Sequence, residues 1–185
     1  SIVLPKGITT IGDDAFSYNT SLTSIKIPNT VTSIGKRAFQ GCTNLTSIEI
    51  PDTVTYIGDY CFSGCNRLQK IKLSKKIQTI NQRLLQGCSS LTEIEIPEGV
   101  KSIGYAAFIS CNKLTTITLP ASLTSFNGTA IAGLSRLTEV KVADGNNSFK
   151  FENGMLLSKD GKTMYMALLT LTEINVPNGV VSIVG

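Results

Sequence analysis

The chain has 185 residues, of which 42% are hydrophobic and 16% charged, and it contains no histidine and no tryptophan. The absence of histidine excludes Ser-His and Cys-His nucleophile pairs and histidine-bearing metal sites. A net charge of +4 from interleaved acids and bases does not indicate a nucleic-acid partner, and no apolar run approaches the ~20 residues of a membrane-spanning helix. We therefore expect no enzyme, no cofactor or metal ion, no nucleic-acid partner and no membrane insertion of this segment.

Leucines recur every 23 residues, at Leu22, Leu45, Leu68, Leu91, Leu114 and Leu137. The blocks that begin at the first five share the consensus L-x-x-I-x-I-P-x-x-V-x-x-I-G-x-x-A-F-x-G-C-x-x, and residues 2–21 form an incomplete earlier copy. A fixed period of this length is typical of solenoids, whose stacked coils share one continuous core.

Each copy begins with a short strand and a corner. The I-x-I stretch, as in residues 25–27, alternates apolar and polar residues and predicts a half-buried strand, so stacked copies should form a parallel sheet. Directly after this strand lies one column that holds every proline of the chain: Pro5, Pro28, Pro51, Pro97, Pro120 and Pro177. Because proline has no amide hydrogen for a sheet ladder, we expect the chain to turn there.

A second extended segment and a third side complete the copy. The V-x-x-I stretch, as in residues 31–34, ends at a column of glycine and asparagine: Gly12, Gly35, Gly58, Asn81, Gly104 and Asn127. Both residue types tolerate positive φ, so we expect a left-handed turn in this column. The A-F-x-G-C stretch that follows predicts a short helical turn with an apolar ladder of Phe16, Phe39, Phe62, Leu85, Phe108 and Ile131.

The repeat breaks after Leu137, because the next leucine of the column, Leu171, follows only after 34 residues. Between them, the pairs 153–154 (Asn-Gly) and 160–161 (Asp-Gly) are flanked by alternating or apolar runs, which are strong hairpin signals. The interruption therefore predicts a small antiparallel meander.

These patterns divide the chain into three parts of one continuous domain. We expect a solenoid over residues 1–142, the inserted meander over residues 143–170 and a resumed partial repeat over residues 171–185. Both ends fall inside a repeat and neither resembles a polar cap, so we expect a fragment of a longer protein.

The repeat resembles the BspA-like leucine-rich repeats, a class with 23-residue copies found mainly in bacterial surface and secreted proteins. The likeness covers nearly the whole chain and is most specific over residues 45–65. It implies a curved, right-handed leucine-rich repeat solenoid of the α/β type, with short parallel strands and short helical turns. It also implies a location at the cell surface or outside the cell, and a host or neighbouring-cell protein as the partner.

Four of the five cysteines share one column: Cys42, Cys65, Cys88 and Cys111. Stacked side chains in a column point the same way, which leaves their Cβ atoms farther apart than the ~3.8 Å of a usual disulfide. We expect free, buried thiols that pack as small apolar groups, and the same for Cys61 in the alanine column. A zinc site from Cys61 and Cys65 would lack paired knuckles and histidine, which disfavours it.

Two surfaces are candidate binding sites. The first, called the sheet face, comprises the outward charges of the main strand: Lys26, Glu49, Lys70, Lys72, Glu93, Glu95, Glu139 and Lys141. Alternating signs from coil to coil predict cross-strand pairs, so the column is either a solvated, self-neutralising face or the surface that binds a partner.

The second surface is an edge with the residues Arg37, Tyr56, Tyr60, Arg83 and Tyr105. Tyrosine and arginine are enriched in binding hot spots, although the same residues could also be unrelated aromatic side chains scattered over the surface.

The sequence leaves two functions open. One is a non-enzymatic adhesion or protein-binding module, and the other is a structural spacer that displays another domain of a longer chain.

Overall fold

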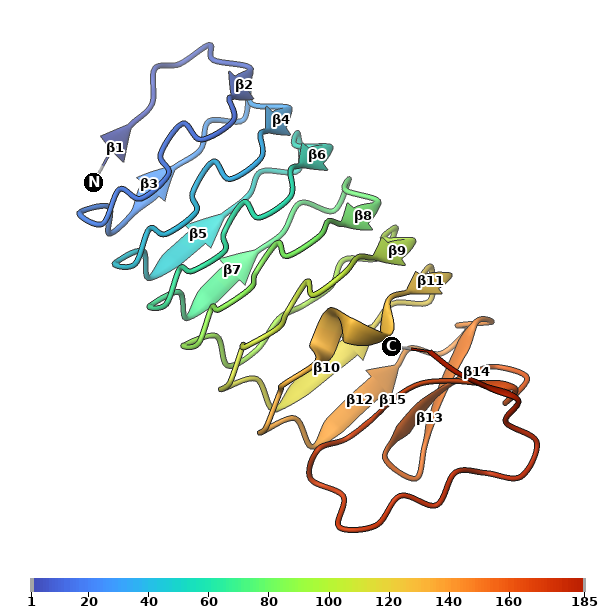
Figure 1. Cartoon of the computed structure of the whole chain (residues 1–185). Coiled ribbons are helices and arrows are strands. Elements are labelled where there is room, and N and C mark those ends of the chain that lie inside the picture. The colour runs from blue at the N-terminus through green and yellow to red at the C-terminus, as the bar shows by residue number, and fades with distance from the viewer. Residues whose placement is uncertain (1, 185) are drawn as a thin grey trace.

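The computed structural model describes residues 2–184, which form a parallel β-solenoid that ends in an antiparallel sheet (Figure 1). Successive coils lie side by side in sequence order, and paired residues of neighbouring coils are 23 positions apart, as Ile48 and Ile71 are. The solenoid predicted from the period of the leucines is confirmed.

The first side of the coils carries the main strands. They are β1 (Ile2–Val3), β3 (Ile25–Lys26), β5 (Ser47–Glu49), β7 (Lys70–Lys72), β10 (Thr116–Leu119) and β12 (Glu139–Val142). Parallel pairs form between β1 and β3, β5 and β7, and β10 and β12. The copy that begins at Leu91 contributes a single bridge from Glu95 to Thr118. The I-x-I pattern thus folds as predicted.

The second side is built from two-residue strands. They are β2 (Thr10–Ile11), β4 (Ser33–Ile34), β6 (Tyr56–Ile57), β8 (Thr79–Ile80), β9 (Ser102–Ile103) and β11 (Ser125–Phe126). They form two parallel sheets in the orders β2-β4-β6 and β8-β9-β11. The proline column makes the corner before this side, where the Val31 amide donates to the Pro28 carbonyl at 3.0 Å.

The copy that lacks proline turns the same corner by different means. Ser74 is fully buried there, and its hydroxyl donates to the carbonyl of Val54 in the preceding coil at 2.5 Å. The same hydroxyl accepts the amide of Lys76 at 3.1 Å. The serine side chain therefore supplies the local bonds that fix the turn.

The glycine and asparagine column does not adopt positive φ, so the expectation of a left-handed turn in it is wrong. Glycine stands there because coils approach closely: a Cβ at Gly58 would lie 2.4 Å from the Lys36 amide nitrogen. The left-handed backbone lies two and six residues later: Asp14, Tyr18, Arg37, Gly41, Tyr60, Gly64, Arg83, Gly87, Ala106, Ser110 and Gly133.

These left-handed residues determine the third side. Consecutive turns form it, as in the bond from the Ser17 amide to the Asp14 carbonyl at 3.0 Å. Because most coils place two left-handed residues four positions apart on this side, a helix cannot propagate. Within residues 2–184 the expected helical turn is present only as η1 (Gly128–Ile131), a 3₁₀ helix that the Asn127 side chain caps.

Third-side amides bond from one coil to the next with a constant direction. The Phe39 amide donates to the Cys61 carbonyl of the following coil at 2.9 Å, and the Phe62 amide donates to Leu84 in the same way. Beneath this side the phenylalanine ladder stacks, with ring centroids of Phe39 and Phe62 5.4 Å apart. Leucine, isoleucine and valine ladders from the other two sides complete the buried core.

The predicted meander is also present. Its strands are β13 (Phe149–Glu152), β14 (Met155–Ser158) and β15 (Thr163–Ala167), which pair antiparallel. Asn153 and Gly154 connect the first two strands with φ values of 50° and 74°, as expected of a tight hairpin turn. The last strand, β16 (Ser182–Ile183), pairs parallel with β15.

One buried side chain joins the meander to the solenoid. Asn146 donates through Nδ2 to the Pro120 carbonyl at 2.8 Å and to the Leu123 carbonyl at 3.3 Å. Its Oδ1 accepts the amides of Ser148 and Phe149 at 2.9 and 2.8 Å. Between the solenoid and the meander, Phe126, Phe149 and Tyr165 also pack edge to face, a geometry that the ring quadrupoles favour.

The partial repeat after the meander resumes one side of the coil. Its second-side strand is β16, whereas the segment in the main-strand column forms no strand. In that segment Ile174 and Val176 are 51% and 40% exposed, although their counterparts in the copies that begin at Leu22 to Leu114 are buried.

Candidate protein-binding surface

The sheet face consists of exposed charges at each of the eight predicted positions. The parallel register places Glu49 opposite Lys72, and their side chains form an ion pair that raises the pKa of Lys72. Lys141 pairs with Glu139 of its own strand at 3.5 Å. Both pairs are in solvent, where such contacts contribute little to stability. Part of this face thus neutralises itself, as one of the two interpretations expected.

Arg37 belongs to the column of left-handed residues at the edge of the third side. Its Nε and Nη2 donate to the two carboxylate oxygens of Asp14 in the preceding coil, each at 2.8 Å. The hydrogen bond from Arg37 holds the pKa of Asp14 below its usual value. The charge of Arg37 is therefore already matched within the chain.

Arg83 occupies the same column two coils further along, where the preceding coil places Tyr60 in the column instead of an acid. Its guanidinium carbon lies 5.4 Å from the ring centroid of Tyr60 and 5.2 Å from that of Tyr105, so it is held between two aromatic faces. Nη1 donates to the Tyr60 hydroxyl at 3.2 Å. No aspartate or glutamate of residues 2–184 forms an ion pair with Arg83. We name Tyr60, Arg83 and Tyr105 the edge clamp.

The stacking of coils assembles the edge clamp. Tyr60 and Arg83 are 23 residues apart and share left-handed backbone, with φ of 58° and 52°, while exposed Tyr105 comes from the next coil. Gln82, which the sequence did not single out, donates through Nε2 to the Tyr60 hydroxyl at 3.1 Å. The remaining predicted edge residue, Tyr56, is an exposed residue of β6 outside these contacts.

The cysteines are free and buried, as predicted. The thiol of Cys65 donates to the Phe39 carbonyl at 3.2 Å, and the other three thiols of its column make the equivalent bond. Burial raises the pKa of Cys65 and of Cys111 to about 12, so these thiols are protonated at neutral pH and are poor nucleophiles. They serve the core and provide no reactive site.

The part of the chain that the structure describes gives no support for metal binding or for a membrane-spanning helix. Residues 2–184 contain no group of three or more aspartate, glutamate or cysteine side chains that could hold a metal ion. No helix among them is both long and apolar enough to span a membrane.

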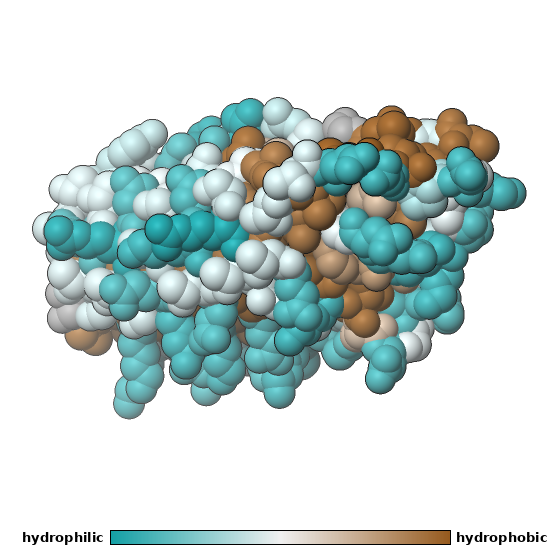
Figure 2. All heavy atoms as spheres, turned by 90° about the horizontal axis from the view of Figure 1, so that it is seen from below, coloured by the Kyte–Doolittle hydropathy of each residue, from teal (hydrophilic) through white to brown (hydrophobic). Residues whose placement is uncertain are grey.

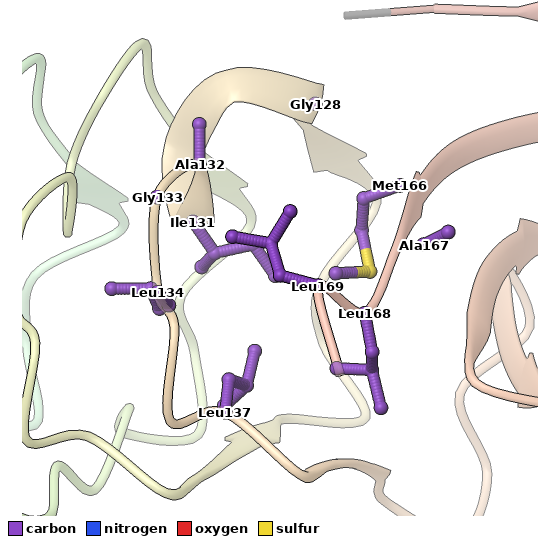
Figure 3. Close-up of a pocket in the computed structure, with 10 residues that line it drawn as sticks. All are labelled: Gly128, Ile131, Ala132, Gly133, Leu134, Leu137, Met166, Ala167, Leu168 and Leu169. Carbon is purple, nitrogen blue, oxygen red and sulfur yellow. The ribbon is translucent and has the colours of Figure 1, made fainter. Parts of the chain in front are cut away.

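Two hollows lie where the meander meets the solenoid. An apolar pocket of about 200 Å³ opens between η1 and the end of β15, with Ile131, Met166 and Leu169 in its wall (Figure 3). A more polar hollow of about 310 Å³ lies between β12 and β13, next to Lys150 and Lys159. The sequence did not predict either, because each depends on how two differently folded parts pack together.

Apolar residues are also exposed toward the C-terminal end. Figure 2 shows polar residues over most of the solenoid and apolar residues gathered toward the end that carries the meander. The exposed large apolar residues of this end are Leu169, Ile174, Val176, Val181, Ile183 and Val184.

Together, coils of 23 residues, parallel strands and a buried leucine column define a leucine-rich repeat protein. The sequence matches the family described as "BspA type Leucine rich repeat region" over residues 1–112 and 32–154, with six copies. The chain belongs to this family, as its motifs predicted. A comparison with curated protein sequences finds no match.

Solved bacterial structures share the fold. A leucine-rich repeat protein of T. pallidum is 26% identical with a TM-score of 0.65, over 71% of this chain and 62% of its own. A leucine-rich repeat protein from Bacteroides ovatus is 30% identical with a TM-score of 0.66, over 83% of this chain and 43% of its own. A leucine-rich cell surface protein from Faecalibacterium prausnitzii is 23% identical with a TM-score of 0.54, over 76% and 59%, which shows the fold alone. The chain spans less than two thirds of each.

Proposed function

We propose that this chain is a non-enzymatic protein-binding module with an adhesive role at the bacterial cell surface or outside the cell. The family supports protein binding, and one structural neighbour is named a cell surface protein. A host or neighbouring-cell surface protein is the proposed partner. The proposed contact surface is centred on the edge clamp, and the sheet face is the secondary candidate.

The observation that carries this placement is the contrast between two arginines of one column. Arg37 forms an ion pair with Asp14, whereas Arg83 lies between two tyrosines and pairs with no acid in the described part of the chain. Tyrosine and arginine side chains dominate binding hot spots, since they combine large contact areas with hydrogen bonds. The eight residues of the sheet face include no aromatic side chain. Two of its charges, Glu49 and Lys72, are already paired with each other.

The test is a binding assay of the immobilised chain against a panel of extracellular-matrix and serum proteins. One variant combines Tyr60→Ala with Arg83→Glu, and a matched variant combines Lys72→Glu with Glu95→Lys on the sheet face. We expect the edge variant to weaken binding at least tenfold and the sheet-face variant to bind like the wild type. Unchanged binding by both variants, with unaltered circular dichroism, would contradict the proposed surface.

The spacer function is the second candidate. Two observations favour it: charges of the sheet face form ion pairs with each other, and the coils share one continuous core. Such a structure suits a rigid spacer whose surface binds no partner. Reproducible absence of binding by the wild-type chain across the panel would favour the spacer over the adhesion module.

A further inference from the structure

The edge clamp holds a guanidinium that forms no ion pair with an acid of residues 2–184. We propose that it binds a carboxylate of the partner protein, from an aspartate, a glutamate or a chain terminus. This inference rests on the proposed function, because it names the chemical group that the protein-binding surface would recognise.

The neighbouring pair Asp14 and Arg37 shows the chemistry within the same column. There a carboxylate of the preceding coil receives two parallel N–H bonds from the guanidinium, each at 2.8 Å. At Arg83 the preceding coil supplies Tyr60 instead of an acid, and Nη1 donates to its hydroxyl. Nε is buried without a hydrogen-bond partner, so a carboxylate would approach the guanidinium through Nη1 and Nη2. A guanidinium has five N–H donors, and carboxylate is the group that matches two of them at once.

The clamp is already organised for binding. The two tyrosine rings hold the guanidinium from both faces, and the Tyr60 hydroxyl is itself fixed by the Gln82 amide. A free arginine side chain would lose rotamer freedom when it binds, which costs affinity. At Arg83 the fold has immobilised the side chain before the partner arrives, so more of the interaction energy remains for binding.

The surrounding charge favours an acidic side chain over a polyanion. Sulfated glycans and nucleic acids need several cations along one track. Lys36 Nζ lies 4.0 Å from the carboxylate of Asp59, the residue before Tyr60, and the other arginine of the column, Arg37, is bound to Asp14. A single unpaired cation between two aromatic rings suits one carboxylate whose methylene groups contact the rings.

Nuclear magnetic resonance titration of the whole chain tests the inference. The probe is the peptide acetyl-Gly-Glu-Gly-amide, with acetyl-Gly-Gln-Gly-amide as its uncharged match, and the signals are the Arg83 Nε–H and the rings of Tyr60 and Tyr105. We expect the Glu peptide to shift these signals saturably and the Gln peptide to leave them in place. Arg83→Gln should weaken binding at least tenfold, whereas Arg67→Gln, at an exposed arginine elsewhere, should change it less than twofold.

Other outcomes would overturn the inference. Equal binding of the Glu and Gln peptides, or retained binding by Arg83→Gln, would show that the guanidinium does not recognise the carboxylate. A response to a heparin oligosaccharide and none to the Glu peptide would assign the clamp to a glycan. If the panel assay shows Arg83-dependent capture while the peptide fails, the carboxylate inference fails alone. If the peptide binds while no panel protein does, the proposed adhesion function fails and the carboxylate site stands.

Discussion

The solenoid and the meander are stabilised in different ways. In the solenoid, each coil repeats the same contacts with its neighbours, including the thiol-to-carbonyl bond of Cys42, Cys65, Cys88 and Cys111. The meander is tied to the solenoid by contacts that occur once, chiefly the two hydrogen bonds from Asn146 to the carbonyls of Pro120 and Leu123. A repeated contact can be lost in one coil and kept in the others, whereas a contact made once has no substitute.

The largest expected effect comes from ionisation of the buried thiols at alkaline pH, and all five cysteines lie in the solenoid, between residues 42 and 111. Burial raises the pKa of Cys65 and Cys111 to about 12, above the ~8.5 of an unfolded thiol. Their contribution to stability is therefore complete below pH ~8.5 and is lost as pH rises toward 12. Each such thiol should lower the free energy of unfolding by up to ~1.4 kcal/mol per pH unit in this range.

Urea unfolding at pH 8, 9 and 10 under reducing conditions measures this slope. The double variant Cys65→Ala, Cys111→Ala should have a shallower slope than the wild type. A slope that the double variant leaves unchanged would refute the assignment to these thiols.

The next largest effect is expected at the close approach between coils. Gly58→Ala places a Cβ 2.4 Å from the Lys36 amide nitrogen, so backbone must shift and the free energy of unfolding should fall by ~3 kcal/mol. Gly12→Ala is the matched control in the same column, because a Cβ there meets nothing within 4 Å. Equal urea midpoints for the two variants would show that crowding does not select glycine in this column.

A smaller and more local effect on stability is expected where the meander joins the solenoid. Asn146→Ala leaves the buried Leu123 carbonyl and the Phe149 amide without partners and removes one of the two bonds to the Pro120 carbonyl, which should cost ~2 kcal/mol. Hydrogen exchange should accelerate in β13 to β15 and stay slow in β5 and β7. The exposed neighbour variant Asn147→Ala should leave both regions unchanged, and uniform acceleration along the chain in Asn146→Ala would argue against a local junction.

The smallest effect is expected at the Asp14–Arg37 pair. Since the hydrogen bond from Arg37 lowers the pKa of Asp14, the contribution of the pair is present above pH ~3.9 and is lost as pH falls through the lowered pKa. In Arg37→Gln, the carboxyl signal of Asp14 should titrate near its ordinary pKa, while the urea midpoint hardly moves because both groups are in solvent. An Asp14 titration that is the same in wild type and variant would contradict the pairing.

Much of the fold follows from the sequence because the constraints on stacked coils act on single columns. A column of leucine or phenylalanine predicts a buried ladder, and the proline after each I-x-I strand predicts a corner. The glycine column led to a wrong prediction, because a sequence position can require glycine for two different reasons. One is a positive φ, and the other is a close approach of backbone that leaves no room for a Cβ. At Gly35 and Gly58 the second reason applies, and it depends on the distance to another coil, which the local sequence does not contain.

The candidate site was predictable only in part. The column spacing placed Tyr60 and Arg83 on neighbouring coils, and the structure brings them into contact. The pairing of Arg37 with Asp14 was not foreseen, although both stand in one column, because it depends on side-chain geometry at left-handed positions. Tyr56 could not be separated from the clamp by composition.

The constant direction of the third-side bonds has an electrical consequence. Along one row the Phe16, Phe39, Phe62, Leu85 and Phe108 amides each donate to the carbonyl of the next coil, at 2.8 to 2.9 Å, and the last acceptor is Ala130. The peptide dipoles in this row are aligned head to tail, as in an α-helix, although the backbone here is not helical. The row therefore has a positive pole toward η1 and a negative pole toward the first coil, and its strength grows with each coil that is added.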